Sequence, residues 1–211
     1  MTETLSFALL SFTSLFTLIN PLGTMPVFMA MTSELTVDQR NKTARKASLV
    51  ALFTIFAFAL TGQLLFNFFG ISVNSFRVVG GVIFFIVGMD MLQARLSQVK
   101  IKENEVKSYI SDISITPLAI PMICGPGAIT SVIVLMEDAN TLPKQIALFS
   151  AVILIIWLTY IILYSSSKLI KLLGQTGINV MMRIMGLIVM VIAVEFFFSG
   201  LKPIILDIIN S

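Results

Sequence analysis

Two short segments rich in proline and glycine carry the residues best able to bind a ligand in this sequence. The first reads Asn-Pro-Leu-Gly at residues 20–23, and the second reads Gly-Pro-Gly at residues 125–127. Proline lacks a backbone N–H and disfavours helical geometry in the residue before it, so each segment is expected to interrupt a helix. An interrupted helix gains one carboxyl-terminal and one amino-terminal end, with partial charges of about −0.5 and +0.5.

These new helix ends predict a site for a small zwitterion built from backbone groups. The amino-terminal ends, near Thr24 and Ala128, suit a carboxylate. The carbonyls freed before Pro21 and Pro126 suit an ammonium group or a cation. The candidate substrate-binding residues are Asn20, Pro21, Gly23, Thr24, Gly125, Pro126, Gly127 and Ala128.

The composition indicates that a membrane surrounds the elements that position this site. Apolar residues make up 57% of the 211 residues and charged residues only 12%, and the mean hydropathy is +0.98. A soluble domain has about 25% charged residues. Histidine is absent and Cys124 is the single cysteine, which excludes imidazole bases, most zinc sites and an internal disulfide.

Six apolar runs are long enough for a hydrocarbon core that needs about 20 helical residues. We therefore predict an all-α membrane protein with six transmembrane helices, of which the first and fourth are discontinuous. The predicted spans are residues 5–31, 47–69, 78–94, 113–136, 145–167 and 184–201.

The basic residues predict the orientation of these spans. Eleven of the 14 Lys and Arg residues lie in the loops after the first, third and fifth spans. Basic loops remain in the cytoplasm. The sequence therefore predicts a multi-pass protein of the cell (inner) membrane with both termini outside.

The two halves of the chain resemble each other. Gly-Ile at 70–71 is followed by an arginine and then by a glycine, and Gly-Ile at 177–178 is followed by the same two residue types. The two Pro/Gly segments are separated by a similar number of residues. We expect a first repeat at 1–94, a cytoplasmic linker at 95–112 and a second repeat at 113–211. Three spans per repeat make the second copy inverted, which is a common plan of secondary transporters.

Four charged residues in the third and sixth spans are candidates for gating or coupling. Arg77 and Arg183 lie near the starts of these spans, and Asp90 and Glu195 lie inside them, where acids are functional candidates by default. At about 1.5 Å per helical residue, Asp90 has the depth of Arg183, and Glu195 has the depth of Arg77. We hypothesise two symmetry-related ion pairs, Arg77–Glu195 and Arg183–Asp90. Snorkelling arginines, or an acid that carries a coupling proton, are the alternatives.

The residues before the second span carry a helix-start signal and a basic cluster. Thr36 and Gln39 fit a capping box, in which each side chain bonds the backbone N–H of the other residue. Lys42, Arg45 and Lys46 then follow along the same helix. We interpret them as an interfacial anchor, with a regulatory lipid site as the alternative.

Several of these motifs resemble the MarC/SnatA family of integral membrane proteins. They are Asn-Pro-Leu-Gly at 20–23, Phe-Gly-Ile-Ser at 69–72, Arg-Val-Val-Gly-Gly at 77–81, Pro-Leu-Ala-Ile-Pro at 117–121 and Gly-Pro-Gly-Ala-Ile-Thr at 125–130. The resemblance covers essentially the whole chain. It implies a six-helix inverted-repeat fold and, for SnatA-like members, ion-coupled transport of small neutral amino acids. By position it implies roles for residues 20, 21, 23 and 125–127; Cys124 replaces an expected small residue such as alanine.

We therefore predict a secondary transporter of the glycine and alanine class that works by alternating access. The expected partners are a small zwitterionic substrate and the lipid bilayer, with no nucleic acid and no cofactor beyond a coupling proton or sodium ion. A homo-oligomer is compatible with the sequence. The alternatives are export of other small or drug-like solutes and a membrane scaffold that transports nothing. We expect no enzymatic activity, because the sequence has no Gly-x-Gly-Asp motif and no histidine.

Overall fold

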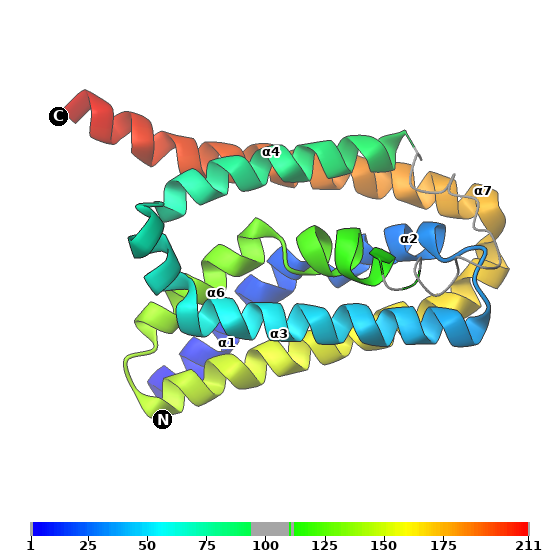
Figure 1. Ribbon diagram of the computed structural model, residues 1–211, viewed down its shortest axis with the longest axis horizontal. Helices are drawn as coiled ribbons and strands as arrows, with labels where there is room; N and C mark the ends of the chain where they lie inside the picture. The colour runs from blue at the N-terminus through cyan, green and yellow to red at the C-terminus, as the bar shows by residue number, and fades with distance from the viewer. Residues whose placement is uncertain (1, 94–109, 111, 211) are drawn as a thin grey trace.

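The computed structural model describes residues 2–93, 110 and 112–210, and this part of the chain is helical with no β-strand (Figure 1). Most of the predicted linker at 95–112 lies outside the described residues. The elements are α1 (Thr2–Ile19), α2 (Pro21–Met31), α3 (Val37–Phe69), α4 (Val73–Leu92), η3 (Ser114–Ile123), α6 (Pro126–Asp138) and α7 (Leu142–Asn210).

Five described segments are long and apolar enough to cross a membrane. They are Glu3–Met31, Val37–Phe69, Val73–Leu92, Leu142–Ser166 and Thr176–Ile209. A sixth crossing results if η3 and α6, which meet at 57°, form one span. The chain therefore has the all-helical, multi-span character that its composition predicts.

Helix α3 begins well before its apolar part. Its N-cap Thr36 accepts a hydrogen bond from Gln39 N at 3.4 Å, and Gln39 Oε1 accepts one from Thr36 N at 2.9 Å. The predicted capping box is confirmed. The helix then runs through the polar residues that precede the predicted span at 47–69.

The predicted loop between the fifth and sixth spans is wrong in form. The chain stays helical on both sides of Gly174, whose φ of 62° and ψ of −177° break the long helix α7. Figure 1 shows that the two halves of α7 run in opposite directions. We call them proximal α7 (Leu142–Ser166) and distal α7 (Thr176–Ile209). Glycine adopts a positive φ without a steric penalty, so one residue replaces a loop here.

Helix α4 packs antiparallel to distal α7 through small residues (Figure 1). A Cβ added at Gly81 would lie 2.8 Å from the carbonyl oxygen of Ala193, and one at Gly88 would lie 3.0 Å from that of Gly186. Backbones approach this closely only where side chains are missing or small. The predicted third and sixth spans are therefore direct neighbours.

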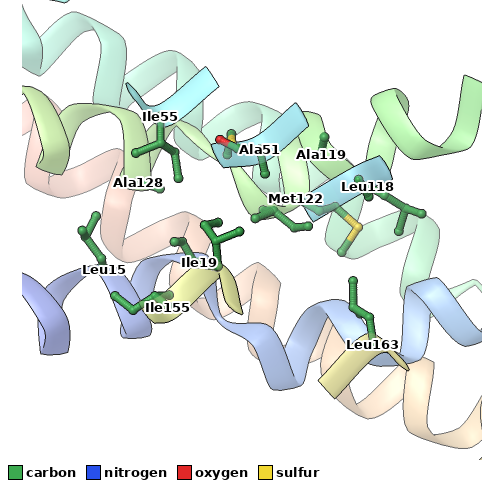
Figure 2. Close-up of a cluster of buried hydrophobic side chains, with 14 of the residues drawn as sticks. Leu15, Ile19, Ala51, Ile55, Leu118, Ala119, Met122, Ala128, Ile155 and Leu163 are labelled. Carbon is green, nitrogen blue, oxygen red and sulfur yellow. The ribbon is translucent and has the colours of Figure 1, made fainter. Parts of the chain in front are cut away.

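Helices α2 and α6 lie in the interior of the bundle. Nine of the 11 residues of α2 and eight of the 13 residues of α6 are buried. Figure 2 shows Ile19, Ile55, Ala128 and Ile155 converging from α1, α3, α6 and proximal α7. The helices that follow the two Pro/Gly segments are thus shielded from lipid, as irregular backbone at membrane depth requires.

Candidate functional site

The first Pro/Gly segment forms a one-residue interruption at Asn20. Asn20 has φ 45° and ψ 66° and is the one non-glycine residue with positive φ in the described ranges. Its side-chain oxygen accepts a hydrogen bond from Gly23 N at 3.1 Å. Asparagine tolerates this left-handed conformation and caps helices well. Asn20 therefore ends α1 and caps α2 at the same time.

The amino-terminal end of α2 lies at Pro21, whereas the sequence predicts this end near Thr24. Proline favours the first helical position because its ring fixes φ and no N–H is lost. The backbone N–H of Thr24 already donates to the Asn20 carbonyl at 3.1 Å, and the Thr24 hydroxyl donates to the same oxygen at 3.2 Å. In this conformation, Asn20 and Thr24 serve the interruption itself.

Pro21 leaves a free acceptor one turn back. In an unbroken helix, the carbonyl of Thr17 would accept a hydrogen bond from the N–H of residue 21. Proline has no N–H, so this carbonyl loses its helical partner. Thr17 lines a cavity at the interruption, and its carbonyl is an acceptor suited to an ammonium group.

The second Pro/Gly segment is more irregular than the first. Thr116 and Ile120, each followed by a proline, have extended backbone angles inside η3. The Cys124 thiol at the end of η3 donates to the carbonyl of Ala51 at 3.1 Å and so ties this segment to α3. Helix α6 then begins at Pro126 with Gly125 as its N-cap.

The amino-terminal end of α6 is buried and has no side-chain cap. Gly127 and Ala128 lie in the first turn, where backbone N–H groups have no partner within the helix. Both residues are buried, and no hydrogen bond reaches either N–H from the described residues. Two unpaired donors at the positive end of a helix dipole make this a favourable place for a carboxylate.

The two segments lie next to each other and share one aromatic side chain. A Cβ added at Gly127 would lie 2.9 Å from Leu18 Cδ2. Leu18 lies two residues before the interruption at Asn20. A Cβ added at Gly125 would overlap the ring of Phe84 from α4. Phe84 also lines the cavity at Asn20. Its ring therefore separates this cavity from the start of α6.

The cavity itself is small, with a volume of about 30 Å³. This space holds a few water molecules at most. Its walls come from α1, α2, α4, η3 and distal α7. The lining residues are Thr17, Leu18, Ile19, Asn20, Gly23, Thr24, Phe84, Val87, Met122, Val189 and Ile192. Of the eight candidate binding residues, Asn20, Gly23 and Thr24 line the cavity, whereas Pro21, Gly125, Pro126, Gly127 and Ala128 do not.

Neither hypothesised ion pair, Arg77–Glu195 or Arg183–Asp90, forms in this structure. Among the described residues, the one ion pair within 4.0 Å joins other residues, at the start of α3. The register of the two helices gives the reason: Arg77 Cβ lies beside Gly200 of distal α7, five residues and about 7 Å beyond Glu195. Gly186, three residues after Arg183, likewise packs between Gly88 and Leu92 of α4, at the level of Asp90. The depths therefore differ within each hypothesised pair.

Three residues that matter here carried no clear signal in the sequence. Thr17 and Phe84 line the cavity, yet Phe84 is one of 17 phenylalanines in an apolar chain. Arg40 is 8% exposed and donates to the carbonyls of Thr32 and Ser33 at 2.8 and 2.9 Å, which caps the end of α2. The charge pattern had indicated only a loop residue.

The chain matches a family described as "MarC family integral membrane protein" over residues 5–205. A UPF0056 membrane protein of Pyrococcus abyssi is 41% identical over 96% of this chain and 98% of the relative. The UPF0056 membrane protein YvbG of Bacillus subtilis is 36% identical, over 93% of this chain and 95% of its own. YhcE of Escherichia coli, of the same description, is 35% identical over 94% of both chains. No solved structure matches the chain. The family resemblance drawn from the sequence motifs is confirmed.

Proposed function

Because the chain belongs to the MarC family of integral membrane proteins, we propose that it is a secondary transporter of small neutral amino acids of the glycine and alanine class. The proposal places the substrate at the meeting point of the two Pro/Gly segments. The single observation that carries it is the buried, uncapped start of α6 beside the interruption at Asn20.

The backbone groups around this point match the two charged ends of an amino acid. The unpaired N–H groups of Gly127 and Ala128 would receive the carboxylate, while the freed carbonyl of Thr17 would receive the ammonium group. Unpaired N–H groups buried in a protein are rare and unfavourable, so a ligand that pairs with them gains affinity. None of the described residues that line the cavity is charged, which favours a substrate with no net charge.

The dimensions of the site support a small substrate and a closed conformation. A cavity of about 30 Å³ is too small for an amino acid of any kind until a wall moves. Phe84 is the wall between the cavity and Gly125. Rotation of its ring would join the two Pro/Gly segments into one chamber, and bulky side chains would still meet Met122, Val189 and Ile192.

Alternating access is the part of the proposal that rests on internal symmetry. The matched motifs support an inverted pair of three-span repeats at 1–94 and 113–211, with the basic loops in the cytoplasm and both termini outside the inner membrane. Transporters of this plan open to either side by rearranging one repeat against the other.

Ion coupling belongs to the same proposal, with backbone carbonyls as the expected ion ligands. Asp90 is partly buried and Glu195 exposed, and neither lines the cavity. We therefore assign the coupling cation to carbonyls at the Asn20 interruption ahead of these acids. As a secondary proposal, gating in a different conformation involves the four charged candidates Arg77, Asp90, Arg183 and Glu195.

Uptake by purified protein in proteoliposomes tests the proposal. Labelled glycine, alanine and leucine are offered under an imposed proton gradient, an imposed sodium gradient, or none, with protein-free liposomes as the control. We expect uptake of glycine and alanine above the control, little uptake of leucine, and stimulation by one gradient. Equal uptake of all three amino acids would refute the size argument, and no uptake under any gradient would refute amino-acid transport.

A further inference from the structure

A second hollow of the molecule lies between α3 and proximal α7, away from the Pro/Gly segments. This groove has a volume of about 360 Å³, far larger than the cavity at Asn20. Its lining residues are Arg45, Ser48, Leu49 and Leu52 from α3 and Ile153, Ile156, Trp157 and Tyr160 from proximal α7.

The groove is a regular feature of two helices that run antiparallel (Figure 1). Each helix contributes residues spaced by three, four and seven positions, which places them on one face of that helix. Phe56 and Phe149 pack edge to face at 5.0 Å, one helical turn beyond Leu52 and Ile153 on the same two helices. The groove therefore has one open polar end, at Arg45 and Tyr160, and an apolar interior.

Ser48 provides an independent sign of a missing ligand. Its side chain is only 4% exposed, and its hydroxyl oxygen has no hydrogen-bond partner in the part of the chain that the structure describes. A buried polar group without a partner is unfavourable and calls for an explanation. Ser48 is one of the lining residues of the groove and lies one helical turn from Arg45.

The charges at the polar end favour an anion. Arg45 is the one charged residue in the lining, and it makes no ion pair with any described residue. Lys42 and Asp38, about one and two turns earlier, pair with each other at 2.7 Å, outside the groove. Among the described residues, no carboxylate therefore neutralises Arg45 where a ligand would meet it.

We propose that this groove binds an anionic phospholipid, with its phosphate on Arg45 and Ser48 and one acyl chain along the apolar interior. Both helices are candidate membrane spans, so the groove opens toward lipid. Basic pockets between such helices suit anionic headgroups, and tryptophan and tyrosine favour the headgroup level. A free anion would leave the apolar interior uncovered.

Trp157 offers a direct probe, because it is the single tryptophan of the chain and lines the groove. Purified protein in mixed micelles is titrated with phosphatidylglycerol or phosphatidylcholine brominated on the acyl chains, and the quenching of Trp157 fluorescence is measured. We expect a preference for phosphatidylglycerol of about fivefold, the factor that one basic residue gives at a membrane surface.

Two variants and one matched control assign this preference to the groove. Arg45→Gln should abolish it, and Ser48→Ala should reduce it about twofold or more while the protein stays folded, because no hydrogen bond is lost. Lys42→Gln removes the same charge from the same end of α3, outside the groove, and should keep the preference.

Three results would overturn the proposal. The first is equal quenching by the two lipids in the wild type. The second is an equal loss in Arg45→Gln and Lys42→Gln, which would mean a general surface charge effect. The third is loss of the preference on adding millimolar glycerol phosphate, which would mean a site for small anions instead of a lipid.

Discussion

Gly125→Ala tests the contact between the second Pro/Gly segment and Phe84. The added Cβ would lie 2.6 Å from Phe84 Cε1 and 2.9 Å from the carbonyl oxygen of Pro121. Both distances are too short, so the ring must rotate, and the cavity of about 30 Å³ is an open space beside it. Overpacking of this kind costs about 1–3 kcal/mol. We expect lower stability and loss of glycine uptake, because the ring would fill the cavity.

We expect Phe84→Leu to rescue Gly125→Ala. Leucine lacks the ring atoms that the new Cβ would meet, although the contact with the Pro121 carbonyl stays. Alone, Phe84→Leu should cost about 1 kcal/mol through a small cavity. In the double variant, we expect the two losses to be less than additive, with a favourable coupling of about 1 kcal/mol or more.

The assay combines the free energy of unfolding in detergent, from denaturant titrations, with glycine uptake in proteoliposomes. Gly70→Ala is the matched control: its φ is +64° and nothing lies within 4 Å of the added Cβ. It should cost about 1–2 kcal/mol through backbone strain alone and leave uptake intact. Strict additivity of the two stability losses would refute the proposed contact, and normal uptake by Gly125→Ala would refute the role of the ring.

Three further substitutions test features that hold the helices in place, each by the free energy of unfolding in detergent. Arg40→Gln removes two charge-assisted hydrogen bonds to the end of α2 and should cost about 3 kcal/mol, with Arg40→Lys retaining part of the stability. Thr36→Ala removes the capping box and should cost about 1 kcal/mol without changing uptake; unchanged stability would mean that the box contributes nothing. Gly88→Leu would force a side chain against the Gly186 carbonyl, 3.0 Å from the new Cβ, and should separate α4 from α7 at a cost of about 1–3 kcal/mol or more. A Gly88→Leu variant as stable as the wild type would refute the close packing.

The sequence predicted those features that depend on local chemistry. The membrane class followed from composition, and the capping box followed from two residues three positions apart. Asn20 caps α2 directly after α1, and η3 is irregular before Pro126; discontinuous first and fourth spans stay a prediction. These features are encoded within a few residues, so no tertiary context overrides them.

The features that the sequence did not predict depend on how helices rotate and pack. The position of Glu195 relative to Arg77 depends on the register in which α4 and distal α7 pack, and this register places Gly200 beside Arg77. The role of Phe84 depends on a contact with Gly125, 41 positions away. Arg40 became a cap only because α2 ends beside the start of α3. One sequence without an alignment carries no record of such long-range pairs.

The glycine-lined contact between α4 and distal α7 has a mechanical consequence. The backbones of these two helices are in direct contact, so neither helix can slide along the other without a steric clash between backbone atoms. Phe84 and Val87 reach the cavity from one of these helices, and Val189 and Ile192 reach it from the other. On this side of the cavity, α4 and distal α7 therefore form one rigid unit, which is connected to proximal α7 through Gly174. If the cavity widens on this side, both helices must move together.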